Sequence, residues 1–266
     1  MSLFEAIILG IVQGLTEFLP VSSSGHIELT KAIFNTQIEE DLLFTVLLHA
    51  ATALSTILVF RKDIMTLFKG LFQFKWNDET KYCLFILISM IPAAIVGLFF
   101  EHKIEALFDS NILLVGLMLL LTGLILLWSD RAPKEQDAPL SNKKATIMGI
   151  VQAIAILPGI SRSGSTIATG LLLGMNRSKA ARFSFIMVLP LILGAALKKV
   201  LDFQEAVNES ITTEYMPLLA GFIAAFLAGL VAINWMIKLV ENSALKWFAY
   251  YCFAVGGLSI GYHLLS

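Results

Sequence analysis

Two interrupted apolar stretches decide the fold of this chain: LFEAIILGIVQGLTEFLPVSSSGHIEL at residues 3–29 and ATIMGIVQAIAILPGISRSGSTIATGLLLGM at residues 145–175. Each begins as an apolar helix, is broken by proline, and continues through serines and glycine into a second helical run. Non-helical backbone persists at membrane depth only where protein buries it or it lines a wet cavity. We therefore expect two re-entrant helix–loop–helix hairpins, each entering and leaving on one side of a membrane.

The composition indicates that the chain belongs in a membrane. Of the 266 residues, 57% are hydrophobic and 15% are charged, against about 45–50% and about 25% in soluble domains. The mean hydropathy is +0.80. The 19 basic and 20 acidic side chains nearly cancel, so no basic excess is left for nucleic-acid phosphates. We expect an integral membrane protein that binds no nucleic acid.

Six further segments approach the roughly 20 apolar residues that a spanning helix needs, and they contain no Asp, Glu, Lys or Arg. They are residues 42–60, 82–100, 111–129, 183–197, 216–237 and 247–265. The fourth is short and contains Pro190, so we expect it to be tilted or partly unwound. The sequence therefore predicts an all-α integral membrane fold of six transmembrane helices plus the two re-entrant hairpins.

The basic residues predict the sidedness of the loops. With both interrupted stretches as hairpins and the 61–81 loop in the cytoplasm, 14 Lys and Arg residues fall in cytoplasmic segments and 4 in external segments. Such a bias is typical of cytoplasmic loops. If either stretch were a full span, the later loops would invert and the bias would weaken. The first hairpin is therefore expected to open outward and the second inward.

The two stretches are copies of each other at an offset of 139 residues. The GIVQ of residues 10–13 recurs at residues 149–152, and seven of the 16 positions from residue 10 to residue 25 are identical. Copies that enter from opposite faces form an inverted-topology repeat, which places its site near the midplane. Shared membrane-helix composition is the alternative explanation, but the recurring Gln and serine spacing disfavour it. We expect one membrane domain over residues 1–266, with repeat 1 at about 1–130 and repeat 2 at about 140–266.

The hairpins carry ionisable groups inside membrane segments, where such groups are functional hypotheses by default. Gln13 and Glu17 are four residues apart and share one helix face, and His26 follows the serines of the first loop. Arg162 lies in the second loop, where serine and glycine lead into a helix N-terminus, an arrangement suited to anions. If the two loops meet, the pocket holds a carboxylate, a histidine, an arginine and several hydroxyls. That set suits phosphoryl chemistry.

Each of these residues also has a purely structural interpretation. Glu17 and Arg162 would form an intramembrane ion pair without catalysis, and His26 would cap or hydrogen-bond a helix. The serines would be helix caps or contacts between helices. His49, in the middle of the first span, is interpreted as a hydrogen-bonded packing residue.

Two motifs are specific enough to carry a family resemblance: GIVQGLTEFLPVSSSGH at residues 10–26 and PGISRSGST at residues 158–166. They are similar to the two signatures of the undecaprenyl-diphosphate phosphatase family, the bacitracin-resistance type, and the resemblance covers essentially the whole chain. It implies hydrolysis of undecaprenyl diphosphate to the monophosphate, which recycles the lipid carrier for peptidoglycan and other envelope polymers. It also implies a bacterial plasma (inner) membrane, and the expected sidedness places the catalytic loop on the outer side.

The resemblance implies catalytic roles for Glu17, Ser23, His26 and Arg162. Substrate-binding residues are expected beside them in both hairpins: Gln13, Ser22, Ser24, Gly25, Ser161, Ser163, Gly164, Ser165 and Thr166. In the hypothesised mechanism Arg162 and the second-loop amides bind the diphosphate, Ser23 or an activated water attacks the terminal phosphorus, and His26 shuttles the proton. Glu17 orients His26 or binds a divalent cation (Mg²⁺ or Ca²⁺). The other cation ligands stay open, because Gln13 stands where some family members carry Glu.

Other functions are compatible with part of this pattern. A lipid-diphosphate flippase or transporter would also have inverted repeats and a midplane site. The Glu–Ser–His set of the first hairpin favours an enzyme, because the second hairpin carries other residues at the equivalent positions: Ile156, Arg162 and Ser165. A channel is disfavoured because no ring of repeated charges occurs. The oligomeric state is open, with a homodimer as one alternative.

The expected sidedness leads to a direct test. A cysteine at Ser24, in a background lacking Cys83 and Cys252, should react with an impermeant thiol reagent added to intact cells, because the first hairpin is expected to open outward. The measurement is the extent of labelling before and after the cells are opened. Labelling that requires opened cells would overturn the predicted topology.

Overall fold

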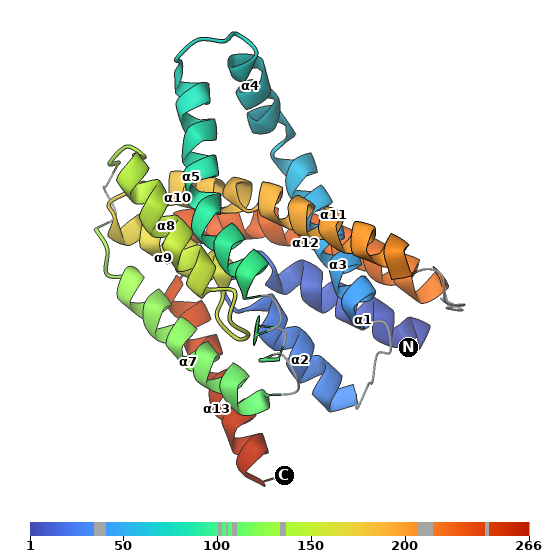
Figure 1. Ribbon diagram of the computed structural model, residues 1–266. Coiled ribbons are helices and arrows are strands. Elements are labelled where there is room, and N and C mark those ends of the chain that lie inside the picture. The colour runs from blue at the N-terminus through green and yellow to red at the C-terminus, as the bar shows by residue number, and fades with distance from the viewer. Residues whose placement is uncertain are drawn as a thin grey trace.

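The computed structural model describes residues 1–34, 41–100, 103–104, 106–107, 111–133, 137–206, 215–242 and 245–265, and these ranges hold helices and no strand. The helices pack around a central region in which the two hairpins meet (Figure 1). One pair projects from this body: Arg61–Leu71 (α4) lies beside the first part of Asp78–Phe99 (α5). The all-α prediction is confirmed.

Both interrupted stretches fold as two helices joined by a loop. In chain order the four helices are α1 (Leu3–Thr16), α2 (Ser23–Phe34), α8 (Asn142–Ile154) and α9 (Arg162–Leu172). Each first helix ends a few residues before a proline, Pro20 or Pro158, because proline disfavours a helical conformation in the residue before it and lacks the N–H that a helix interior needs. The loops are therefore where the sequence predicts them.

The candidate spans agree in part with the six expected. Five runs are long and apolar enough to cross a membrane: α5, α7 (Ile112–Ser129), the Arg177–Lys198 run, α12 (Tyr215–Glu241) and α13 (Leu245–Leu265). A sixth exists if α3 (Asp41–Val59) and α4, which meet at a bend of 76°, count as one span. The 61–81 segment, treated above as a loop, thus begins with a helix.

The irregular fourth span has its break just before the proline. A single residue, Val188, separates α10 (Arg177–Met187) from α11 (Leu189–Ala206). Pro190 therefore lies in the first turn of α11, where its missing N–H leaves no hydrogen bond unmade. The run from Arg177 to Lys198 is 22 residues long, so the span is longer than the apolar core alone predicts.

Glycines set the closest helix contacts. α1 packs on α12 at Gly10, where an added Cβ would overlap the carbonyl oxygen of Gly221. α8 packs on α5 at Gly149, where a Cβ would overlap the backbone of Ser89. Close backbone approach at small residues is the usual way in which membrane helices associate. These two contacts hold the first helix of each hairpin in place.

The Gly10 contact predicts opposite effects for two glycine-to-alanine changes. Gly10→Ala should destabilise the protein by about 1–3 kcal/mol, because α1 and α12 must separate. Gly257→Ala is the matched control, since nothing lies within 4 Å of its added Cβ and alanine favours a helix by about 1 kcal/mol. The measurement is the thermal unfolding midpoint in detergent. Equal midpoints for the two variants would contradict the packing described.

Candidate active site

Glu17 lies at the centre of the site, at the C-terminal end of α1, and is only 6% exposed. Its Oε2 accepts hydrogen bonds from Gln13 Nε2 at 3.0 Å and from Ser23 Oγ at 2.6 Å. Its Oε1 is paired with the Arg162 guanidinium. The ring Nε2 of His49 lies 3.9 Å from Oε2. One buried carboxylate therefore joins both hairpins and the first span.

The two loops repeat the same local geometry. In the first loop Ser22 Oγ accepts from the Gly25 N–H at 3.2 Å and lies 3.4 Å from Ser24 Oγ. In the second loop the matching distances are 3.0 Å from Gly164 N to Ser161 Oγ and 3.3 Å from Ser161 Oγ to Ser163 Oγ. Ser22 and Ser161 thus cap α2 and α9, as the structural interpretation of the serines anticipates. Their role in substrate binding stays a prediction.

The loops contact each other through their smallest residues. A Cβ on Gly25 would lie 3.2 Å from the Gly159 Cα, and a Cβ on Gly164 would lie 3.0 Å from the Pro20 Cβ. Ser163 Oγ donates to the carbonyl oxygen of Leu19 at 3.2 Å. These contacts bring the N-terminal ends of α2 and α9 to the same region, beside Glu17.

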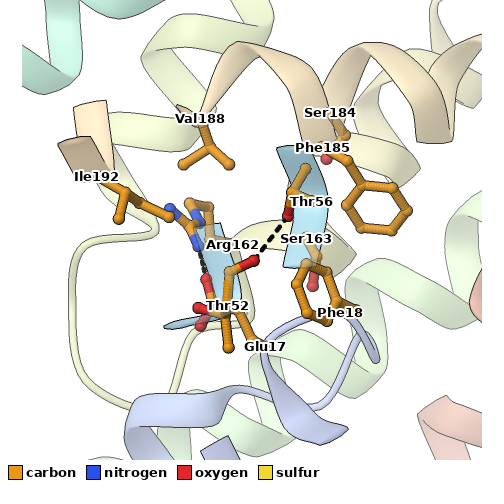
Figure 2. A pocket seen from close by; sticks show the side chains of 10 residues that line it. All are labelled: Glu17, Phe18, Thr52, Thr56, Arg162, Ser163, Ser184, Phe185, Val188 and Ile192. Carbon is orange, nitrogen blue, oxygen red and sulfur yellow. Dashed lines mark hydrogen bonds and ion pairs between the residues drawn. The ribbon is translucent and has the colours of Figure 1, made fainter. Parts of the chain in front are cut away.

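A small pocket opens beside the ion pair. Its polar lining comes from Glu17, Arg162, Ser163, Thr52, Thr56 and Ser184, and its apolar lining from Phe18, Phe185, Val188 and Ile192. Figure 2 shows Glu17 and Arg162 pointing toward each other, with Ile192 beside the arginine. A pocket lined by both polar and apolar side chains suits an anionic group attached to a hydrocarbon.

Of the predicted binding residues, Ser163 alone is among the ten that line this pocket, and the predicted catalytic residues Ser23 and His26 lie outside that lining. Thr166 Oγ1 is within 2.6 Å of Ser184 Oγ and donates to the Arg162 carbonyl at 2.8 Å. Ser165 Oγ is buried and has no hydrogen-bond partner. Neither residue lines the pocket, so a direct contact of either with substrate stays a prediction.

His26 is held by groups other than those expected. Its Nδ1 lies 2.8 Å from the Ser22 carbonyl oxygen, and its Nε2 lies 2.8 Å from the Tyr251 hydroxyl. The structure shows no direct hydrogen bond between His26 and Glu17, whose carboxylate oxygens accept from Gln13, Ser23 and Arg162. Orientation of His26 by Glu17, one of the two alternatives given for that carboxylate, stays a prediction.

The comparison with known proteins shows the family of the chain. The family described as "Bacitracin resistance protein BacA" matches residues 6–258. The chain belongs to the BacA family. A protein of Christiangramia forsetii named undecaprenyl-diphosphatase is 59% identical over 258 residues, 96% of each chain. A protein with the same name from Parabacteroides distasonis is 51% identical, and the match covers 100% of each chain. Another from Methanococcus vannielii is 45% identical, and the match covers 94% of this chain and 96% of the relative.

Several side chains of this BacA-family site are not predicted by the motifs. His49 is interpreted above as a hydrogen-bonded packing residue, and its Nδ1 does lie 2.8 Å from the Thr45 carbonyl oxygen, but its Nε2 also lies beside Glu17. The sequence did carry a signal for His49: it lies inside an apolar span, where a polar side chain costs free energy and therefore indicates a functional role. Thr52 and Thr56 follow it on the same helix and line the pocket. Tyr251 gives no signal in the sequence, because an aromatic residue in a membrane helix is common.

The residues present fit a divalent cation that arrives with its ligand. Among the residues that the structure describes, no three His, Cys, Asp or Glu side chains come together, so Glu17 would be the one carboxylate. Gln13 Oε1 is buried and accepts no hydrogen bond, which gives a second hard oxygen beside it. Mg²⁺ is commonly held by one or two carboxylates together with substrate phosphates. Glu17 and Gln13 supply two oxygen donors, and the substrate phosphates would supply the others.

Proposed function

We propose that this BacA-family protein is an enzyme that hydrolyses undecaprenyl diphosphate to undecaprenyl phosphate and inorganic phosphate. That reaction recycles the lipid carrier for cell-wall synthesis and confers bacitracin resistance. The relatives named as undecaprenyl-diphosphatases, aligned over nearly the whole chain, support this function. The main structural support for this function is that the Glu17 carboxylate accepts a hydrogen bond from the Ser23 hydroxyl and also forms an ion pair with Arg162.

In the proposed mechanism Ser23 is the nucleophile and Glu17 is its base. The Ser23 hydroxyl already donates to Glu17 Oε2 at 2.6 Å, so Glu17 can take that proton as the serine oxygen attacks the terminal phosphorus. The serine–phosphorus bond forms while the bond from that phosphorus to the bridging oxygen breaks, and undecaprenyl phosphate leaves. Water then attacks the serine phosphate: the bond from its oxygen to phosphorus forms as the serine–phosphorus bond breaks, Glu17 returns its proton to the Ser23 oxygen, and inorganic phosphate leaves. His26, four residues after Ser22, shuttles a proton in one of these steps.

Arg162 supplies the charge that a diphosphate needs. Its side chain is 25% exposed, and within the described part of the chain its Nη2 donates to Glu17 and its other nitrogens make no hydrogen bond. The remaining N–H groups can grip two phosphate oxygens in a fixed fork. The amide N–H groups at the start of α9 favour the same anion. Positioning and charge stabilisation of this kind are what phosphoryl transfer mainly requires.

A divalent cation, Mg²⁺ or Ca²⁺, belongs to this proposal. Glu17 and the Gln13 carbonyl oxygen would hold it together with the diphosphate. It would supply positive charge next to the phosphate oxygens. The protein's own residues carry the proton transfers described above.

The membrane setting follows the predicted topology. We propose that both hairpins are re-entrant repeats, that the Glu17 loop faces the outer side of the bacterial inner membrane, and that the prenyl chain stays in the bilayer. The 14-to-4 distribution of basic residues supports this orientation. A homodimer stays an untested alternative. The flippase alternative gains no support, because the relatives named above are called diphosphatases.

Phosphate release by the purified protein tests the function. In detergent with Mg²⁺, the wild type should release phosphate from undecaprenyl or farnesyl diphosphate, and Glu17→Ala should lose roughly 100-fold or more in rate because Ser23 loses its base. Glu241→Ala is the matched control, since Glu241 is an exposed carboxylate at the end of α12. Full activity of Glu17→Ala would show that the assigned site is wrong.

The role of Arg162 is tested by a series of variants. Arg162→Lys should lose most activity although the charge is kept, because an ammonium cannot reproduce the two-oxygen grip. Arg162→Ala should lose nearly all, since one such transition-state contact is worth about 3 kcal/mol, roughly 100-fold in rate. The measurement is the same phosphate release.

A binding measurement separates a phosphate ligand from a structural ion pair. In the Glu17→Ala background no carboxylate is left for Arg162 to neutralise, so a purely structural Arg162 predicts that the further change Arg162→Ala leaves the affinity for farnesyl diphosphate unchanged. A phosphate ligand predicts that the double variant binds farnesyl diphosphate more weakly than Glu17→Ala does. Equal affinities would therefore overturn the role assigned to Arg162.

A further inference from the structure

The structure fixes which nitrogen of His26 carries the proton. A carbonyl oxygen can only accept a hydrogen bond, so the 2.8 Å contact between Nδ1 and the Ser22 carbonyl requires a proton on Nδ1. In the neutral ring Nε2 is then the nitrogen with the lone pair. The Tyr251 hydroxyl, 2.8 Å away, therefore donates to Nε2.

Tyr251 holds the ring in a second way. The phenol and the imidazole are stacked, with ring centroids 5.6 Å apart and planes 10° apart. His26 is thus fixed by a hydrogen bond at each nitrogen and by a ring on one face. Few conformations satisfy all three contacts at once, so the Tyr251 side chain sets where Nε2 points.

α13 also contacts the first loop through Cys252, the residue after Tyr251. Cys252 is completely buried, and its thiol lies 3.7 Å from the Pro20 carbonyl oxygen, which accepts its weak hydrogen bond. This contact fixes the position of α13 against the first loop, and with it the approach of Tyr251 to His26. The neighbouring Tyr250 points elsewhere: it is 51% exposed and packs edge-on against Trp247.

We propose that Tyr251 is a positioning residue for His26 in the phosphatase reaction. It acts through the imidazole: its hydroxyl and its ring keep the Nδ1–H form in place, with the Nε2 lone pair ready to receive a proton. This inference rests on the proposed function, because Tyr251 can assist the reaction in this way only if His26 transfers a proton during phosphate release. Nothing in the motifs of the two hairpins assigns a role to this helix.

The test combines kinetics with a matched tyrosine. Tyr251→Phe keeps the stacked ring and removes only the hydroxyl, so kcat for phosphate release from farnesyl diphosphate should fall roughly 10-fold while KM stays nearly unchanged. Tyr250→Phe should retain wild-type kcat. In a His26→Ala background Tyr251→Phe should cause no further loss, because a residue that acts through His26 has nothing left to position.

Three kinetic outcomes would overturn the proposal. One is full activity of Tyr251→Phe. Another is an equal loss in the wild-type and His26→Ala backgrounds, which would indicate an independent structural role. The third is the same loss in Tyr250→Phe, which would indicate a general effect of changing α13.

A spectroscopic measurement separates this proposal from the proposed function. In protein with ¹⁵N-labelled histidine, the His26 signals are identified by their loss in His26→Ala. The Nε2 signal should be that of an unprotonated nitrogen that accepts a hydrogen bond, and Tyr251→Phe should shift it toward a free unprotonated nitrogen. An unchanged signal would overturn the positioning role even if phosphate is released. A wild type that releases no phosphate would overturn the function, while this spectrum would still decide whether Tyr251 holds His26.

Discussion

The ion pair between Glu17 and Arg162 is the interaction on which the arrangement of the two hairpins depends. An ionised carboxylate buried in an apolar interior is very costly unless donors surround it. Glu17 obtains its donors from its own helix, its own loop and the other hairpin, through Gln13, Ser23 and Arg162. Because Arg162 lies 145 residues further along the chain, this requirement brings the second loop against the first.

Such a close approach is possible only where side chains are small. Gly25 faces Gly159, and Gly164 faces Pro20, at distances where even an added Cβ would make a tight contact. The same constraint applies to the first helix of each hairpin, where Gly10 and Gly149 allow α1 and α8 to contact the backbones of α12 and α5. A bulky residue at any of these positions would separate the donors from Glu17, so the packing and the chemistry of the site depend on the same glycines.

Much of the fold could be predicted from the sequence, because its signals are local. Pro20 and Pro158 end helices by the geometry of their own rings, and a run of apolar residues reports a span directly. The pairing of Glu17 with Arg162 could also be anticipated, since two opposite charges inside a membrane need each other. The bend between α3 and α4 could not, because it depends on how α4 packs against α5.

The remaining part of the site depends on contacts that sequence spacing does not encode. His49 and Tyr251 come from helices far from the motifs, and their relation to Glu17 and His26 exists only in the folded chain. His26 illustrates this limit. The hypothesised mechanism offered Glu17 as a group that orients it, whereas in the folded chain the ring bonds to the Ser22 carbonyl oxygen and to the Tyr251 hydroxyl of α13.

The offset of 139 residues explains why a single carboxylate can occupy the meeting point of two loops. Ser23 and Arg162 are equivalent positions under this offset, and both contact Glu17, one through a hydroxyl and the other through a guanidinium. The position equivalent to Glu17 is Ile156, so no second carboxylate competes for these donors. The helices α2 and α9 begin at these same two residues, and their N-termini favour negative charge there.

Without substrate, Glu17 supplies that negative charge. A diphosphate carries more charge and more acceptor oxygens than one carboxylate, so in the proposed mechanism it would draw Arg162 away from Glu17 and leave Glu17 free to act as a base.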